Sequence, residues 1–273
     1  MTNLDKPMLP RPAIRQDPLP QAGDSLRERL DDLVYGKGLY WMMVVLFLFL
    51  LTGMDWWRYV GKVPATLAGV LTETALTLIV GVFAGVRVRR AWWEMKTVKQ
   101  GIRGEVHVSQ YLRATCVPQG YRMFDDVPGK GSGGKFNIDH VLIGPGGVFS
   151  IETKNWELPA KGTTAFMTYE PKAGTLTEPD GTFHDKEVRQ AKANGDYLRK
   201  LLAERVNRQV FVKPVLILPG WYVKDPTPRP RPIWIMGNET LHQWLEEEEV
   251  RLSEGDIAAL AAELGNYVRN FGK

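Results

Sequence analysis

The sequence predicts an α/β domain with a mixed sheet, preceded by a transmembrane helical hairpin. Two long apolar stretches with aromatic ends lie in the first third of the chain. After them, segments with helical and strand patterns follow in the order αβββαβ, which is typical of helices packed on a sheet. The net charge of +4 is compatible with a polyanionic partner or an anionic membrane and does not choose between them. Cys116 is the only cysteine, which excludes an intramolecular disulfide.

Residues 1–37 are predicted to be a cytoplasmic N-terminal arm that is partly disordered. Prolines and charged residues dominate as far as about residue 24, and this composition buries too little apolar surface to fold alone. A short helix is expected at 26–34, where leucines fall on one stripe and charged residues lie off it.

Residues 38–90 are predicted to hold two transmembrane helices. No residue from Gly38 to Met54 is charged, and the stretch from Val63 to Val86 carries a single charge, Glu73. Aromatic residues flank both stretches, as expected at the two membrane interfaces. A buried helical hairpin in a soluble protein is the alternative. Glu73 indicates a contact with the first helix or with another copy of the chain, which leaves a homo-oligomer open.

Basic residues indicate the orientation of this hairpin. Arg27, Arg29 and Lys37 precede it, whereas the loop between the two helices holds only Arg58 and Lys62. Five more basic residues follow the hairpin: Arg87, Arg89, Arg90, Lys96 and Lys99. Positive residues stay on the cytoplasmic side, so we expect a multi-pass protein of the cell (inner) membrane with both termini in the cytoplasm.

The rest of the chain is predicted to form one α/β domain. Residues 91–100 should continue the second membrane helix as a stalk, because nothing there breaks a helix. The domain proper, 101–220, should contain helices at 101–112 and 185–206 and strands at 121–127, 136–143, 148–154, 165–169, 174–177 and 210–218. Residues 221–273 should complete it with a strand at 233–236, a helix at 239–248 capped by Asn238, and a helix at 254–270.

Residues 129–135 read GKGSGGK and are predicted to be a mobile glycine-rich loop. The run lacks the ending that a phosphate-binding loop requires. We therefore interpret it as a basic rim, at which Lys130 and Lys135 could contact phosphates of a nucleic acid.

Residues 136–154 are predicted to form a hairpin that carries the chemistry. A turn centred on Pro145 and Gly146 would place Asp139 directly opposite Glu152, with Lys154 on the same face. Opposed like charges are destabilising, and a divalent cation between them reverses this effect. The alternative is a solvent-facing hairpin with ordinary surface charges.

Two helices are expected to bring further polar groups to this face. Glu105 lies on the inward side of the helix at 101–112, and Gln190 lies on the packing side of the helix at 185–206. His140 follows Asp139 on the opposite face of its strand, where a core or supporting role is favoured over a direct one.

An Asp, a Glu-x-Lys on the adjacent strand and a helix-borne Glu are the residues that metal-dependent phosphodiester hydrolysis needs. Asp139 and Glu152 would hold Mg²⁺ (or Mn²⁺), with the backbone carbonyl of Thr153 as a third ligand. Lys154 would orient the nucleophile and stabilise the developing charge. In this interpretation Glu105 supports the water shell or a second cation, and Gln190 orients Lys154 or the water by a hydrogen bond.

Several motifs, in order, resemble those of the nuclease-related domain (NERD) family of the PD-(D/E)XK nuclease superfamily. They are Gly101-x-x-Gly104-Glu105, Asn137-Ile138-Asp139-His140, Gly144-Pro145-x-Gly147-Val148-Phe149, Ile151-Glu152-Thr153-Lys154-Asn155-Trp156 and Gln190. The resemblance covers roughly residues 100 to 220 and implies a restriction-endonuclease-like αβββαβ core. The matching catalytic positions are Glu105, Asp139, Glu152, Lys154 and Gln190. One departure is that Trp156-Glu157-Leu158 is not followed by the glycine that is common in the family.

The favoured interpretation is a membrane-anchored, cytoplasm-facing, metal-dependent nuclease that acts on DNA rather than RNA and uses no small-molecule cofactor. One alternative is a catalytically inactive nucleic-acid-binding or scaffold module at the membrane. Another makes the membrane hairpin the working part of a transport or envelope complex. The sequence contains no helix-turn-helix or zinc finger that would read bases, and it does not distinguish endonuclease from exonuclease action.

Overall fold

The computed structural model of the chain describes residues 19–61, 66–159 and 165–272. Residues 1–18 of the predicted N-terminal arm and Lys62 of the predicted interhelical loop lie outside these residues. Residues 19–23, which were expected to belong to a disordered arm, are among the described residues. There Ala22 is buried.

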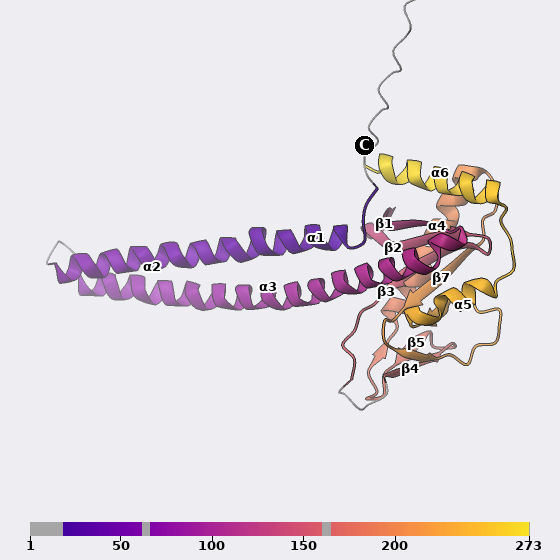
Figure 1. The fold of residues 1–273 in the computed structure, drawn as a ribbon. Coiled ribbons are helices and arrows are strands. Elements are labelled where there is room, and N and C mark those ends of the chain that lie inside the picture. Colours follow the sequence, from indigo (N-terminus) through magenta and orange to yellow (C-terminus); the bar gives the residue numbers. More distant parts are fainter. Residues whose placement is uncertain (1–18, 62–65, 160–164, 273) are drawn as a thin grey trace, which may run out of the picture.

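The N-terminal half of the structure is a pair of long helices (Figure 1). The first rod consists of α1 (Asp24–Asp31), a π-helical turn (Asp32–Gly38) and α2 (Leu39–Val60). The second is α3 (Leu67–Thr115), a single helix of 49 residues that runs back beside the first. The predicted second membrane helix, the stalk and the first helix of the α/β domain are therefore one continuous helix.

Polar contacts join the two rods within their apolar stretches. The hydroxyls of Thr52 and Thr77 lie 2.7 Å apart, and Trp56 Nε1 donates to Thr74 Oγ1 over 2.9 Å. Most of the large apolar side chains still face outward, among them Phe47, Phe49, Ile79 and Val82. Two helical segments, Asp24–Val60 and Leu67–Gln119, are long and apolar enough to cross a membrane. Neither is buried inside this chain, unlike the helical hairpin that a soluble fold would enclose.

The α/β domain is built on a five-stranded mixed sheet in the order β1-β2-β3-β7-β9. Its strands are β1 (Arg122–Gly131), β2 (Gly134–Gly144), β3 (Gly147–Thr153), β7 (Val212–Ile217) and β9 (Trp234–Met236). The first three strands are antiparallel, while β7 and β9 run parallel to β3. The end of α3, β1, β2, β3, α4 (Lys186–Val206) and β7 give the predicted αβββαβ order and the predicted mixed sheet.

Helices cover both faces of this sheet, as the apolar patterns require. On one face, α4 and α6 (Glu254–Asn270) bury Leu198 and Leu260 against Val141. On the other, the last turns of α3 and α5 (Leu241–Glu246) bury Leu112 and Leu241 against strand residues. Short 3₁₀ turns, Val117–Gln119 and Asn238–Thr240, precede β1 and α5 respectively.

A second sheet of four short strands has the order β6-β5-β4-β8. Its strands are β4 (Phe166–Glu170), β5 (Thr175–Thr177), β6 (Phe183–His184) and β8 (Tyr222–Lys224). The sequence predicted β4 and β5 and missed β6 and β8. Met167 and Tyr169 pack with Leu216 of the main sheet, so one apolar cluster joins the two sheets.

Three local predictions are corrected by the structure. The expected glycine-rich loop is the tip of the β1–β2 hairpin, where Lys130 pairs with Lys135 and Gly131 with Gly134. Asn238 does not cap a helix, because it starts a 3₁₀ turn whose cap position is Gly237. The regular alternation expected for the strand at 136–143 is interrupted between Ile138 and Val141, because both side chains pack in one cluster while Phe149 and Ile151 lie in the other.

Candidate active site

Asp139 lies where the β2–β3 hairpin stops pairing. The predicted register of this hairpin is confirmed up to the His140–Ile151 pair, one pair short of the expected pairing of Asp139 with Glu152. Beyond that pair, the backbone N–H of Thr153 donates to Asp139 Oδ2 over 2.7 Å. The Asp139 carboxylate thus takes the place of a backbone acceptor where the β2–β3 hydrogen bonds end. This bond holds the carboxylate beside Glu152.

Glu152 is almost completely buried, and both of its oxygens are hydrogen-bonded. Lys154 Nζ donates to Oε1 over 2.6 Å, and Asn194 Nδ2 of α4 donates to Oε2 over 2.8 Å. The predicted proximity of Glu152 and Lys154 is therefore confirmed. A buried carboxylate requires such partners, because each oxygen left without a donor costs about 1–3 kcal/mol.

Asn194 is the residue of α4 that reaches the acids, and the sequence analysis did not select it. It lies four residues after Gln190, on the same helical stripe, so both positions share the face that packs on the sheet. Gln190 is half-buried, and its role in orienting Lys154 stays a prediction. The helical spacing could have indicated Asn194, because this amide follows the amide of Gln190 by one turn on the same face of the helix.

Glu105 comes to the site from α3. Gly104 permits this, because a Cβ at position 104 would lie 2.4 Å from the Cβ of Asn155. Asn155 is further tied to α3 by two hydrogen bonds of 2.8 Å, from Gln100 Nε2 to its carbonyl and from its Nδ2 to the carbonyl of Gln100. The helix is therefore fixed against the chain segment that follows β3, with Glu105 buried between them.

Asp126 is a further buried acid that the sequence analysis missed. It has φ +50°, in the left-handed region that few residues other than glycine adopt. Asn137 Nδ2 donates to its Oδ1 over 2.6 Å, while the backbone N–H and the hydroxyl of Ser25 donate to Oδ2 and Oδ1 over 2.6 and 2.8 Å. The N-terminal end of α1 is therefore bound to a carboxylate of this site.

The pKa values of the acids are raised. Burial, followed by the charges of Asp126 and Glu152, raises the pKa of Glu105 to about 7. Burial, followed by the charges of Glu152 and Glu105, raises the pKa of Asp139 well above its ordinary value. Burial alone would lower the pKa of Lys154, but the carboxylates of Glu152 and Asp139 outweigh it and raise that pKa. The site holds more negative charge than Lys154 neutralises, so it favours an added proton or cation.

The chemistry of these donors fits a hard divalent cation. Asp139 and Glu152 offer carboxylate oxygens, which Mg²⁺ and Mn²⁺ prefer. Within the described residues, no three His, Cys, Asp or Glu side chains are grouped so that they could hold a metal. Lys154 is bound to Glu152 Oε1, so a cation there would share this oxygen with the ammonium group. The predicted ligation by the Thr153 carbonyl stays a prediction.

The two lysines predicted for nucleic-acid binding lie at the tip of the β1–β2 hairpin. Lys130 and Lys135 are exposed and face each other, and the backbone N–H of Lys130 donates to the hydroxyl of Tyr197 over 3.3 Å. Their contact with phosphates stays a prediction.

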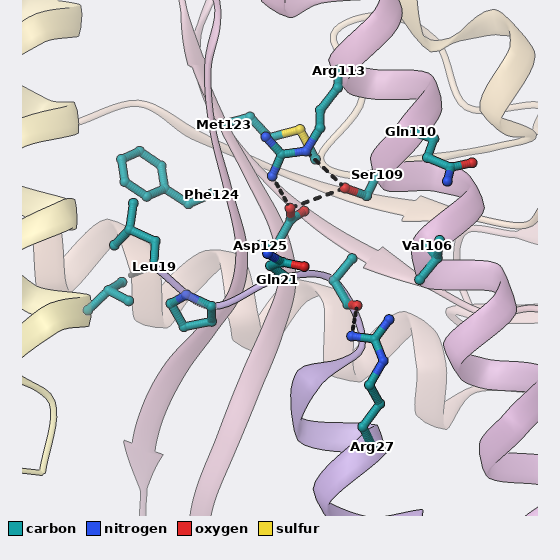
Figure 2. A pocket seen from close by; sticks show the side chains of 13 residues that line it. Leu19, Gln21, Arg27, Val106, Ser109, Gln110, Arg113, Met123, Phe124 and Asp125 are labelled. Carbon is teal, nitrogen blue, oxygen red and sulfur yellow. Dashed lines mark hydrogen bonds and ion pairs between the residues drawn. The ribbon is translucent and has the colours of Figure 1, made fainter. Parts of the chain in front are cut away.

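His140 belongs to a separate buried network. Its Nδ1 lies 2.7 Å from Asp125 Oδ1, and Arg113 and Ser109 of α3 bind the other oxygen of Asp125 (Figure 2). Burial alone would raise the pKa of Asp125, but the bonds to His140 and Arg113 outweigh it and lower that pKa. This network links β1, β2 and α3 and gives His140 a supporting place.

Fold and site together define an α/β domain that gathers buried acids and one lysine at the end of β3, the central strand of a mixed sheet. Residues 100–219 match the family of the nuclease-related domain (NERD), so this segment of the chain is a nuclease-related domain. Neither the comparison with curated proteins nor the comparison with solved structures gave a match. The family gives the protein a nuclease-related function, which implies a nucleic-acid substrate and, in general, a divalent metal.

Proposed function

We propose that this protein is a metal-dependent nuclease that hydrolyses phosphodiester bonds in DNA at the cytoplasmic face of a cell membrane. One observation carries the proposal. Glu105, Asp139, Glu152 and Lys154 interact electrostatically with one another inside a nuclease-related domain. Acids that raise one another's pKa beside a charged lysine are typical of catalytic centres.

Each residue receives a role from its environment. Lys154 is kept protonated by Glu152 and Asp139, so its ammonium group can stabilise the charge that develops on a phosphate. Asp139 and Glu152 would hold Mg²⁺ or Mn²⁺, which supplies Lewis acidity when bound. Glu105, whose pKa is about 7, can take up or release a proton at neutral pH and so assist a water molecule.

The membrane anchor is supported by the exposed apolar surface of α2 and α3. Phe47, Ile79 and Val82 are each more than half exposed, at 61%, 67% and 71%. Soluble monomers rarely expose a continuous apolar surface along two long helices, whereas lipid covers such a surface. The basic residues that flank the helices favour cytoplasmic termini, which places the site on the same side.

The full chain, purified in detergent, tests this proposal. It is expected to cut DNA only when Mg²⁺ or Mn²⁺ is added. Lys154→Ala and Asp139→Asn should each reduce the cleavage rate by about 100-fold or more, because the first removes a charge that stabilises the transition state and the second weakens binding of the metal ion. Lys172→Ala, at an exposed turn of the second sheet, is the matched control and should cut at the wild-type rate. Cleavage that is equal in all four proteins would contradict the proposal.

A second candidate function is a nucleic-acid-binding scaffold without turnover. It is favoured by the bonds of Glu152, because Lys154 and Asn194 satisfy both carboxylate oxygens without a cation. Salt-sensitive DNA binding that survives Asp139→Asn, together with no cleavage of DNA or RNA under any metal, would support this function over the first.

A further inference from the structure

A pocket of about 620 Å³ opens beside the candidate active site, between the long helices and the chain after β3. Glu105 and Lys154 line its inner end. The outer wall comes from Leu26 and Arg29 of α1 and from Trp93 of α3, which all lie outside the nuclease-related segment 100–219. Segments outside the nuclease-related domain therefore form one wall of the pocket beside its candidate active site.

The pocket is held in shape by bonds across its walls. The reciprocal hydrogen bonds of Gln100 and Asn155 join α3 to the segment after β3, and Lys96 Nζ lies 3.5 Å from Glu157 Oε1 further along the same wall. Ser25 fixes the start of α1 to the α/β domain through Asp126. The walls belong to elements that are anchored independently, so the opening does not depend on one contact.

The inner end of the pocket is polar and holds charges of both signs, the carboxyl group of Glu105 and the ammonium group of Lys154. The side chain of Lys154 is 26% exposed, so its ammonium group remains accessible while it binds Glu152. The hydroxyl of Thr153 is buried in this wall and has no hydrogen-bond partner. Arg29, on the opposite wall, is exposed. A phosphate group can accept hydrogen bonds from the accessible side chains of Lys154 and Arg29.

The outer end of the pocket is aromatic. Trp93 is half-exposed, and Lys96 Nζ lies 5.8 Å from the centre of its ring. Trp156, on the facing wall, is held in place by stacking on His184, with ring centres 4.1 Å apart and planes inclined by 23°. Flat aromatic surfaces beside cations are the features that bind the bases and the backbone of single-stranded nucleic acid.

We propose that this pocket binds one unpaired nucleotide next to the scissile phosphate, so that the protein acts on single strands or unpaired ends. The inference rests on the proposed function, because it assumes that a phosphodiester reaches Lys154. Ligand pockets of roughly 300–1,000 Å³ take a group of nucleotide size, whereas a base inside a duplex must first leave the stack to enter one. A lipid headgroup shares the phosphate but has no flat base to stack on Trp93 and Trp156, so it is disfavoured.

Binding of labelled oligonucleotides to the full chain in detergent, with a chelator present to prevent cleavage, tests this pocket. The wild type should bind a single strand more tightly than a blunt hairpin duplex. Trp93→Ala should weaken single-strand binding about tenfold, the size expected for one lost base stack, and Trp93→Phe should restore most of it. Trp92→Ala, the adjacent exposed tryptophan that does not line the pocket, is the matched control and should change affinity less than about twofold.

The outcomes separate this inference from the proposed function. The inference would be overturned if Trp93→Ala and Trp92→Ala changed the affinity for the single strand equally. It would also be overturned if the wild type bound the duplex as tightly as the single strand. Anionic phospholipid vesicles that displace the oligonucleotide from the wild type, in a way that depends on Trp93, would also overturn the inference. The pocket would then be a site for a lipid headgroup. A pocket that behaves as expected in a protein that cuts nothing with Mg²⁺ or Mn²⁺ would leave the inference standing and refute the nuclease.

Discussion

Glu105 is the residue whose protonation state changes near neutral pH. Its pKa is raised to about 7 by burial and by the charges of Asp126 and Glu152. Between the ordinary carboxyl value and pH 7, the folded state therefore binds more protons than the unfolded state. This contribution makes the cation-free protein less stable as pH rises through that range. A cation bound at the site would remove the penalty, because it would replace the proton.

We expect the affinity for Mn²⁺ to rise steeply with pH up to about 7 and then to level off. If binding displaces one proton from the site, the rise is about tenfold per pH unit below the pKa. Glu105→Gln should flatten this dependence, because the amide does not titrate. Calorimetric titration with Mn²⁺ at several pH values measures it. An equally steep dependence in Glu105→Gln would show that another group controls binding.

Asn194 is expected to matter more for stability than Gln190. Asn194→Ala leaves a buried oxygen of Glu152 without its donor, which should lower the free energy of unfolding by about 1–3 kcal/mol. Gln190→Ala is the matched control on the same helix face and should cost less. Urea denaturation of both variants decides the comparison, and a larger loss for Gln190→Ala would be incompatible with the geometry described above.

The sequence predicted the acids of the site better than their partners. Asp139, Glu152 and Lys154 follow from hairpin register, which is local and depends on alternation and a glycine-containing turn. Asp126 and Asn194 could not be selected in this way, because their roles depend on Ser25 and Glu152, which are far away in the chain. Only the tertiary fold brings such pairs together.

Among the elements, α3 is the one that joins the two halves of the molecule. It carries the apolar stretch at one end and Glu105 near the other. Its continuity could be predicted, because no helix breaker lies between residues 87 and 100. The strands β6 and β8 were missed because they are short and have no buried residue, whereas the equally short β9 is buried throughout. The glycine run of the β1–β2 hairpin was misjudged, because cross-strand pairing overrode the flexibility of glycine.

Gly104 should be intolerant of any side chain. Gly104→Ala places a Cβ 2.4 Å from the Cβ of Asn155, so α3 must move away from the segment after β3. We expect a loss of about 1–3 kcal/mol in the free energy of unfolding and a lower cleavage rate, since Glu105 shifts with the helix. Gly255→Ala, in the first turn of α6, is the control, because its Cβ would lie 3.8 Å from Ser253 Oγ, at ordinary contact distance. Unfolding monitored by circular dichroism gives both values, and equal stability of the two variants would contradict the expected clash.

At the scale of the whole molecule, the apolar helices and the α/β domain are separate in space (Figure 1). We expect the protein to stay with membranes during alkaline extraction. Its C-terminus should be cleaved by protease only when the cytoplasmic side is accessible, because flanking basic residues keep both termini there. Inverted vesicles and intact cells provide the two orientations. Release by alkali would show that the helices do not span the bilayer.

The rigidity of α3 also limits where catalysis can take place. If the bilayer ends near Arg87, the 19 residues from Arg87 to Glu105 rise roughly 25 to 30 Å along one unbroken helix. A flexible linker would let the domain move through a wide volume. The rigid helix α3, packed against α1, instead holds the site at one distance from the membrane and in one orientation. Under the proposed anchoring, the protein would diffuse in the membrane with its active site at a fixed height above the bilayer. Nucleic acid would be cut only where it comes within that thin layer.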